Sequence, residues 1–321
     1  MRAAGFDRYG SPQVVRVIEL PDPVAGPGAV LVRVTAACVT SADVAARSGD
    51  PFAIRLIVGL TRPRRRVLGT EFAGVIESTG ADVTRFAVGD RVVAASGATF
   101  GAHAELVTVA EDGAIAKIRD DIQLADALAV AEGALTALPF LRDHARLAAG
   151  QRILINGASG SVGSAAVQLA KLFGAHVTAV CSAANTDLVT ALGADRVIDY
   201  GSEDFTAGGE YDVIFDAVGA STFGRSRKVL APGGTYLTTV PDPRILLDGL
   251  RARRSGQTAK LALTGLRKNA DKRADLEWLM PLVADGSLVP VIDSRYPLDR
   301  VADAHARVDT RRKRGAVLLE F

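Results

Sequence analysis

A glycine-rich turn between an apolar run and a helical pattern most constrains how this chain can fold. Residues 153–155 are Ile-Leu-Ile and predict a buried parallel strand. The turn at residues 157–163, Gly-Ala-Ser-Gly-Ser-Val-Gly, follows directly, and apolar residues then recur at helical spacing as far as Phe173. A strand, a glycine turn and a helix in this order are the context of a dinucleotide-binding fingerprint, in which the helix N-terminus holds the pyrophosphate.

Individual positions of the turn have distinct expected roles. Gly160 would let the backbone approach the pyrophosphate, and Gly163 would let the helix pack closely on the strand. The first glycine of the usual pattern is replaced by Ala158. The alternative interpretation is an ordinary strand-to-helix turn that binds no ligand.

Apolar strands alternate with helical and turn segments beyond the fingerprint. Strands are expected at residues 176–180, 196–200, 211–218 and 234–240, with a short helix at 186–192 and a Pro232-Gly-Gly turn before the last strand. This alternation predicts an α/β domain with a doubly wound parallel sheet, the Rossmann type.

The rest of the chain has another pattern. Short alternating strands separated by Pro- and Gly-rich turns predict an irregular β-barrel or sandwich. They are expected at residues 14–20, 30–35, 72–78, 91–95 and 104–109, with a helix at 124–144 and further strands at 287–292 and 316–321. We therefore expect a β domain of residues 1–122 and 276–321, an inserted dinucleotide-binding domain of residues 123–275, and a cleft between them that receives the reactive end of the cofactor.

Composition excludes several function classes. A net charge of +2 over 321 residues gives no argument for nucleic-acid binding. The N-terminus carries charges where a signal peptide needs apolar residues, and no run reaches the roughly 20 apolar residues of a membrane span. Cys38 and Cys181 lie too far apart in sequence to suggest a disulfide framework or a metal cage. We expect a cytoplasmic protein that acts on a small molecule.

Collinear motifs run along essentially the whole chain, at residues 6–12, 67–74, 88–93, 132–138, 157–163, 192–200, 289–298 and 312–315. With these motifs the chain resembles the medium-chain dehydrogenase/reductase superfamily, and most of all its zinc-free quinone oxidoreductase-like branch. The resemblance implies a GroES-like β domain with an inserted Rossmann domain. It also implies hydride transfer from a nicotinamide cofactor to a quinone or an α,β-unsaturated carbonyl compound, and we expect a homodimer.

Threonines occupy the two positions where zinc-dependent relatives place ligands. Those relatives have Cys at the position of Thr40 and His at the position of Thr70, and the four-Cys structural zinc lobe is missing from residues 91–104. A catalytic zinc needs about three His, Cys or carboxylate donors, so we expect no bound metal. Thr40 could hydrogen-bond a substrate carbonyl, and Asp43 is nearby in sequence. The candidate catalytic residues are therefore Thr40, Asp43 and Thr70. Packing in the cleft wall is an equal alternative for both threonines, and solvent could supply the proton.

The loop after the second strand bears on the choice of cofactor. NAD-binding proteins place an acidic residue here, whereas this chain has Cys181 and Ser182. Ser182 and Asn185 can donate hydrogen bonds, and the resemblance places Tyr200 near a 2′-phosphate. We predict NADPH, with NADH possible. The predicted cofactor contacts are Thr136, Ala158, Ser159, Gly160, Ser161, Val162, Gly163, Cys181, Ser182, Asn185, Tyr200, Val218, Gly219, Thr239 and Val240.

Two basic segments, at residues 61–66 and 244–273, have no place in this scheme. The second carries nine Lys or Arg residues against two Asp. It could be a solvated, mobile flap, or a surface for an acidic partner such as a CoA- or carrier-linked substrate or an anionic membrane holding a quinone. Beside the quinone or enone reductase, two functions stay open: a specialised enoyl or alkene reductase of a biosynthetic pathway, and a non-catalytic NADPH-binding sensor or interaction protein.

Overall fold

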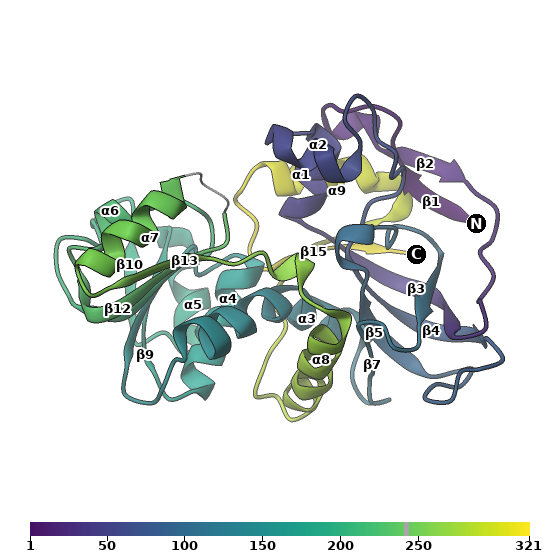
Figure 1. The fold of residues 1–321 in the computed structure, drawn as a ribbon. Coiled ribbons are helices and arrows are strands. Elements are labelled where there is room, and N and C mark those ends of the chain that lie inside the picture. The colour runs from purple at the N-terminus through teal and green to yellow at the C-terminus, as the bar shows by residue number, and fades with distance from the viewer. Residues whose placement is uncertain (241–243) are drawn as a thin grey trace. The chain divides into compact units, whose positions relative to one another are not determined.

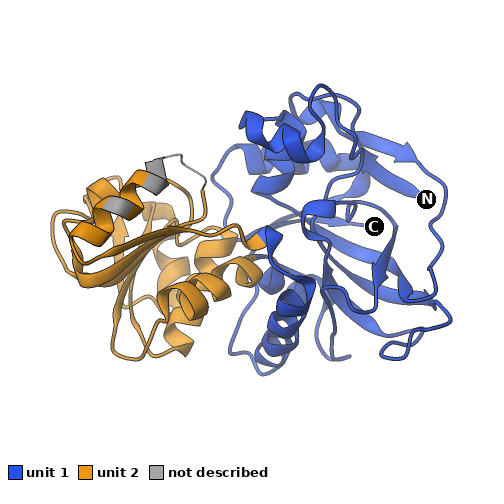
Figure 2. Ribbon diagram, viewed as in Figure 1, with its two compact units in different colours: residues 1–132, 265–321 blue, residues 133–264 orange. Residues whose placement is uncertain are grey.

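The computed structural model describes residues 1–240 and 244–321, which form two compact units (Figure 2). Unit 1 comprises residues 1–132 and 265–321, and unit 2 comprises residues 133–264. The expected boundaries at residues 122 and 276 therefore differ from those of the structure. The helix α8 (Asn269–Ala284) packs against the strand β7 (Ile115–Lys117), and this contact places the whole helix in unit 1.

Unit 2 contains a six-stranded parallel sheet in the order β10-β9-β8-β11-β12-β13. Numbered from its first strand, this is the order 3-2-1-4-5-6 of a doubly wound dinucleotide-binding fold, as the alternating strands predict. The strands are β8 (Arg152–Asn156), β9 (His176–Cys181), β10 (Arg196–Asp199), β11 (Tyr211–Asp216), β12 (Leu230–Thr238) and β13 (Thr258–Leu261). The helices are α4 (Ser161–Leu172), α5 (Thr186–Ala191), α6 (Phe223–Ser226) and α7 (Arg244–Arg254), with the 3-10 helices η5 (Ala183–Asn185) and η6 (Thr264–Leu266), of which η6 extends into unit 1 (Figure 1).

One expectation for unit 2 is wrong. The strand β12 begins at Leu230, ahead of the Pro232-Gly-Gly sequence expected to precede it, and the pairing of β11 with β12 shifts register between Tyr211 and Val213 to accommodate those residues. The basic segment 244–273, for which a mobile flap and a surface for an acidic partner were both left open, contains α7, the sixth strand β13 and the start of α8. Residues 241–243 lie outside the described chain.

Unit 1 is built on a seven-stranded sheet and a separate two-stranded one. The large sheet has the order β14-β15-β3-β4-β5-β7, and β6 pairs with β3. Its strands are β3 (Ala29–Val39), β4 (Glu71–Thr79), β5 (Arg91–Ala95), β6 (Leu106–Ala110), β7, β14 (Ile292–Pro297) and β15 (Ala316–Glu320), while β1 (Arg2–Gly5) pairs with β2 (Arg16–Glu19). This is the expected β domain with its late return, although the penultimate strand begins at Ile292 instead of residue 287.

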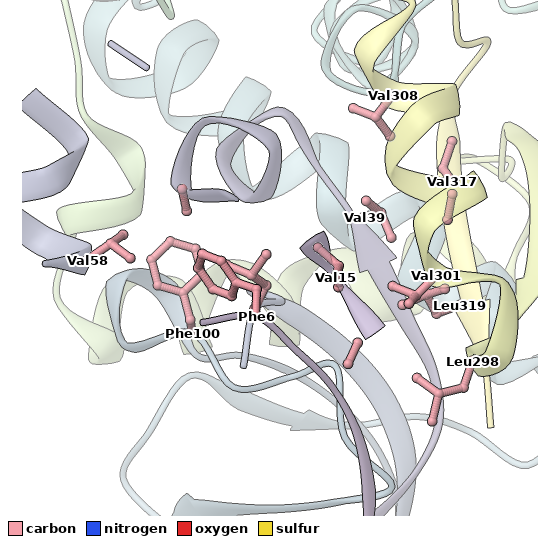
Figure 3. Close-up of a cluster of buried hydrophobic side chains, with 14 residues drawn as sticks. Phe6, Val15, Val39, Val58, Phe100, Leu298, Val301, Val308, Val317 and Leu319 are labelled. Atoms are coloured by element: carbon pink, nitrogen blue, oxygen red, sulfur yellow. The ribbon is translucent and has the colours of Figure 1, made fainter. Parts of the chain in front are cut away.

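The helices of unit 1 are fastened by an apolar core. These helices are α1 (Ser41–Ser48), α2 (Arg55–Val58), α8 and α9 (Val301–Asp309), with 3-10 helices η1 (Pro12–Val14), η2 (Phe52–Ile54), η3 (Gly97–Thr99) and η7 (Leu298–Arg300). Figure 3 shows Phe6 and Phe100 beside Val58 of α2, and Val301 and Val308 of α9 beside Val317 of β15. The core therefore fixes α2 and α9 against the body of unit 1.

The helix α3 (Leu124–Pro139) continues as the π-helix η4 (Phe140–Ala145). Together they form one helix that is long and apolar enough to cross a membrane, and 72% of its most apolar window is buried inside the structure. The sequence contains no uninterrupted apolar run of this length because charged residues such as Asp126 and Glu132 interrupt it. Its burial is that of a core helix.

Candidate functional site

Packing explains two of the glycines in the turn between β8 and α4. Gly157 has a φ of +79°, which favours glycine, and a Cβ built on it would lie 2.4 Å from a methyl of Val218. A Cβ on Gly163 would lie 2.1 Å from the carbonyl oxygen of Gly157. Gly163 therefore lets α4 begin directly against the turn, which is a role in packing.

Gly160 differs from these glycines because space surrounds it. The nearest atom to a Cβ built there is the Gly157 carbonyl oxygen, at 3.6 Å. The first N–H bonded within α4 is that of Ser164, which donates to the Gly160 carbonyl at 2.8 Å, so the amides of Ser161, Val162 and Gly163 point out of the helix end. Outward amides and an uncovered glycine backbone suit a diphosphate group.

The predicted residues of the loop after β9 are linked to the glycine turn. Asn185 donates from Nδ2 to the hydroxyl of Ser159 at 2.9 Å, and both side chains belong to unit 2. The buried Oδ1 of Asn185 has no hydrogen-bond partner within the described residues. A buried acceptor of this kind is costly unless a ligand or water completes it, so it fits a site for the hydroxyls of a ribose.

An acidic residue that the sequence motif does not contain lies beside this loop. Asp199 ends β10, opposite Cys181 in the register, and its carboxylate accepts hydrogen bonds from Ala183 N at 3.1 Å and Gly201 N at 3.0 Å. Burial and the Asp199 charge raise the pKa of the Cys181 thiol to about 11. No carboxylate directly follows β9 in the sequence, but the parallel pairing of β10 with β9 places the Asp199 carboxylate beside the loop after β9. Tyr200 follows with an exposed side chain.

The carboxyl ends of β11 and β12 form a second part of the candidate nucleotide site. Asp216 is buried and accepts from Asn156 Nδ2 at 3.1 Å and from Ser221 N at 2.8 Å, which holds the loop after β11 in place. In that loop, a Cβ on Gly219 would lie 2.8 Å from the Val240 side chain. The exposed side chains of Val218 and Val240 therefore adjoin the glycines of both loops and offer an apolar surface.

Two predicted contacts have hydroxyls with partners inside unit 2. Thr239 donates from Oγ1 to the Ala217 carbonyl at 3.1 Å, and the hydroxyl of Thr264 lies 3.5 Å from that of Thr136. The Thr239 bond thus links the segment after β12 to the loop after β11, and the Thr136 contact links the helix α3 to the start of η6.

The predicted catalytic residues Thr40 and Asp43 form a capping box at the start of α1. Thr40 donates to Asp43 Oδ2 from both N, at 2.8 Å, and Oγ1, at 2.7 Å. The other oxygen, Oδ1, accepts from Gly69 N at 2.7 Å. Because the Thr40 hydroxyl donates its proton to Asp43 and already accepts from Asp43 N at 3.3 Å, it has one lone pair and no proton left for another group. The buried Asp43 therefore positions the loop that carries Thr70.

Thr70 leads to a carboxyl group that the sequence argument did not include in the site. Its hydroxyl donates to Glu71, and burial together with the charges of Glu132 and Asp43 raises the pKa of Glu71 to about 8. The Lys272 ammonium opposes this shift without cancelling it, and burial lowers its own pKa. A carboxyl group that holds its proton at neutral pH is a candidate general acid.

The donor set around Thr40 and Thr70 does not suit zinc. The Thr40 hydroxyl donates to Asp43 and the Thr70 hydroxyl to Glu71, and the nearby Cys38 is a buried thiol whose pKa burial raises well above its usual value. Across residues 1–240 and 244–321, no group of three or more His, Cys, Asp or Glu side chains is placed to hold a metal ion.

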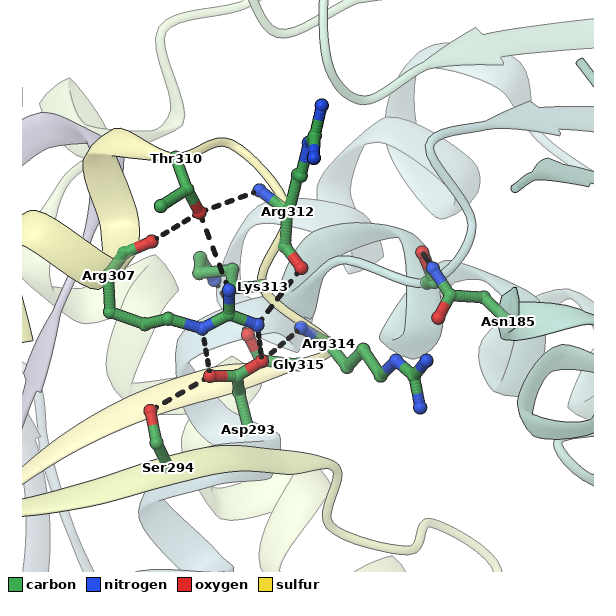
Figure 4. A network of polar contacts seen from close by, with 10 residues as sticks. Asn185, Asp293, Ser294, Arg307, Thr310, Arg312, Lys313, Arg314 and Gly315 are labelled. Atoms are coloured by element: carbon green, nitrogen blue, oxygen red, sulfur yellow. Dashed lines mark hydrogen bonds and ion pairs between the residues drawn. The ribbon is translucent and has the colours of Figure 1, made fainter. Parts of the chain in front are cut away.

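The turn before β15 is held by an ion pair in unit 1. Arg307 donates from Nε and Nη2 to Asp293 at 2.7 and 2.5 Å, and Asp293 also accepts from Arg314 N at 2.7 Å (Figure 4). The Arg307 guanidinium holds the pKa of Asp293 below its usual value despite burial. This network fixes the backbone of the basic Arg312-Lys-Arg turn.

Comparisons with known proteins match both parts of the chain. Residues 26–120 match the alcohol dehydrogenase GroES-like domain, and residues 192–319 match a family described as zinc-binding dehydrogenase. The chain is 30% identical to a chloroplastic quinone oxidoreductase of Triphysaria versicolor, over 100% of this chain and 98% of the relative. It is 32% identical to a mitochondrial NAD(P)H oxidoreductase of Bos taurus, over 99% of this chain and 89% of that relative. The solved structure of the quinone oxidoreductase from Coxiella burnetii is similar in fold over 100% of this chain and 99% of that chain, with 27% sequence identity and a TM-score of 0.89.

Proposed function

Because the chain belongs to the quinone oxidoreductase-like part of the medium-chain dehydrogenase/reductase superfamily, we propose that it is a zinc-independent, NADPH-dependent reductase of quinones or α,β-unsaturated carbonyl compounds. The observation that carries the proposal is the uncovered Gly160 backbone at the N-terminus of α4, at the carboxyl edge of a parallel sheet. Ligands of open α/β sheets bind at this edge.

A nicotinamide cofactor, when bound, supplies the hydride. In the proposal, the amides of Ser161 to Gly163 hold its diphosphate, and Ser182 and Asn185 contact the adenosine ribose. The exposed Val218 and Val240 provide an apolar surface for a ring. NADPH is proposed because Ser182 and Asn185 can donate to a phosphate, and NADH stays possible because the Asp199 carboxylate adjoins the same loop.

Zinc independence is proposed from the chemistry of the donors. A neutral threonine hydroxyl is a poor ligand for zinc, and catalytic zinc sites have about three His, Cys or carboxylate ligands. Reduction of a quinone or an enone does not require a Lewis acid, because hydride adds to a carbon or oxygen that the conjugated carbonyl already activates.

Glu71 is the proposed proton donor. In the proposal, Glu71 in its protonated form donates to Thr70 Oγ1, which reverses the hydrogen bond seen in the structure, and the Thr70 hydroxyl then donates to the substrate oxygen. As the substrate carbon accepts hydride, its oxygen takes the Thr70 proton, Thr70 takes the Glu71 proton, and solvent later reprotonates Glu71. The product gains one hydride and one proton in total.

The direct experiment is a screen for substrate-dependent oxidation of NADPH and NADH with quinones, enones and enoyl thioesters, on protein analysed for metals. We expect turnover without stoichiometric zinc. One zinc per chain, with activity lost on its removal, would contradict the zinc-independent part. A preference for enoyl thioesters would instead favour a specialised biosynthetic reductase.

A further inference from the structure

Four large apolar side chains are exposed within nine residues of unit 1. They are Phe52 (62% exposed), Leu56 (75%), Ile57 (48%) and Leu60 (53%), on η2, α2 and the turn after them. They come from one short segment, because α2 (Arg55–Val58) follows η2 directly and Gly59 ends the helix just before Leu60. Grouped apolar side chains with a polar rim mark interaction surfaces, whereas single exposed ones do not.

Cationic residues follow these apolar residues in the sequence. Arg62, Arg64, Arg65 and Arg66 are exposed, and none of the four has an ion-pair partner within the part of the chain that the structure describes. Asp50 is the only acidic residue between positions 50 and 66, which also include Arg55. The segment therefore carries a strong positive charge that the rest of unit 1 does not neutralise.

The segment is fixed to the core of unit 1. Val58 is fully buried in the apolar cluster of Figure 3, and its carbonyl accepts from Arg64 N at 2.8 Å. Gly59 lets the chain turn back so that Arg64 reaches Val58, because a Cβ on Gly59 would lie 2.1 Å from the Arg62 carbonyl oxygen. The Arg55 guanidinium lies 4.5 Å from the centre of the Tyr9 ring. The apolar side chains and the arginines thus belong to one segment that is fixed on unit 1, which we call the α2 surface (residues 52–66).

We propose that the α2 surface docks this protein on an anionic phospholipid bilayer. The apolar side chains would enter the boundary between headgroups and acyl chains, and the neighbouring guanidinium groups would pair with lipid phosphates. A nucleic acid would engage the arginines but leave four large apolar side chains in water. Charge and exposed apolar area together favour a lipid surface, and this inference does not depend on the proposed reaction.

Vesicle sedimentation tests the proposal on the full chain. We expect binding to vesicles of phosphatidylcholine mixed with phosphatidylglycerol, weak binding to phosphatidylcholine alone, and a decrease with added salt. Arg64→Glu with Arg65→Glu should weaken binding on the order of tenfold or more, and Leu56→Ser should weaken it severalfold. Arg253→Glu with Arg254→Glu makes the same charge change at exposed positions of α7 and should leave binding nearly unchanged.

Tryptophan fluorescence gives a second readout that does not rely on loss of binding. Leu56→Trp should shift its emission to the blue on anionic vesicles, whereas Leu247→Trp, at an exposed position of α7, should not. Absence of binding to any vesicle, or equal loss from the two charge reversals, would overturn the proposal. Tight binding to a DNA duplex that Leu56→Ser leaves unchanged, without vesicle binding, would also overturn it by showing a general polyanion site.

Discussion

The Oδ1 atom of Asp43 lies 2.7 Å from the backbone nitrogen of Gly69, so a buried carboxylate at the start of α1 holds the loop that carries Thr70. The same carboxylate accepts both donors of Thr40 through its other oxygen. Thr40 and Thr70 are thus connected through Asp43 and the backbone of Gly69.

This connection predicts a structural effect for Asp43→Asn. An amide nitrogen cannot accept a hydrogen bond, so at least one of the buried donors loses its partner, at about 1–3 kcal/mol of folding free energy. Chemical denaturation should show that loss, and NADPH affinity should stay unchanged because the cofactor residues belong to unit 2. Unchanged stability together with lost turnover would instead show that Asp43 acts directly on the substrate.

The raised pKa of Glu71 predicts a dependence of stability on pH. Its pKa is about 8 in the folded protein, above the ordinary value of 4.5, so the folded state binds this proton more tightly. Stability therefore falls as pH rises between these values. Glu71→Gln should reduce the fall by roughly 1–2 kcal/mol, allowing for solvent screening of a partly exposed group.

Urea denaturation across this pH range measures the effect, with Glu77→Gln as a control on the same strand at an exposed position. If Glu71→Gln leaves the pH dependence of the free energy of unfolding unaltered, Glu71 does not hold a proton in the folded protein. If Glu71 is the proton donor, turnover should also decline as pH rises through about 8, and the variant should lose that decline.

The space around Gly160 predicts opposite effects for two glycine substitutions. Gly160→Val meets no protein atom closer than 3.6 Å at its Cβ, so the chain should fold normally while its branches obstruct the diphosphate and abolish cofactor binding. Gly163→Ala places a Cβ 2.1 Å from a backbone oxygen and should lower the melting temperature. Calorimetry of binding and thermal unfolding separate the two, and an unchanged NADPH affinity in Gly160→Val would refute the assignment.

Two charge changes beside the loop after β9 predict opposite shifts in cofactor preference. Ser182→Asp puts a carboxylate where a 2′-phosphate is expected and should move preference toward NADH. Asp199→Asn removes the carboxylate beside Ala183 N and should move it toward NADPH. Each change should alter the ratio of the two affinities about tenfold, as expected for one hydrogen bond to a charged group. Ratios that stay constant in both variants would locate the phosphate elsewhere, for example near Tyr200.

Periodicity predicted the parts of the fold that depend on local pattern. The apolar strands β8, β9 and β11 are largely buried and stand out in the sequence, so the parallel sheet was predicted with small errors at its ends. The strand β13 was missed because its residues, Thr-Ala-Lys-Leu, lie in a basic segment and resemble a surface loop.

Site residues could be predicted where they belong to a contiguous sequence motif. They could not be predicted where the pairing of strands or the packing of helices brings them to the site. The glycine turn is one contiguous motif. Asp199 reaches the loop after β9 only through the parallel pairing of β10 with β9, and the protonated state of Glu71 depends on burial and on charges from α1 and α3. Such three-dimensional neighbours leave no local signature in a single sequence.

The most direct test of the account is deuterium transfer from NADPH labelled at the reactive carbon of its nicotinamide ring. Metal-free protein is incubated with the labelled cofactor and an enone, and the product is examined by mass spectrometry. We predict one deuterium on the reduced carbon of the product, with none transferred by the Gly160→Val variant. Tight NADPH binding with no transfer to any enone, and no reduction of any quinone, would show instead a non-catalytic NADPH-binding protein.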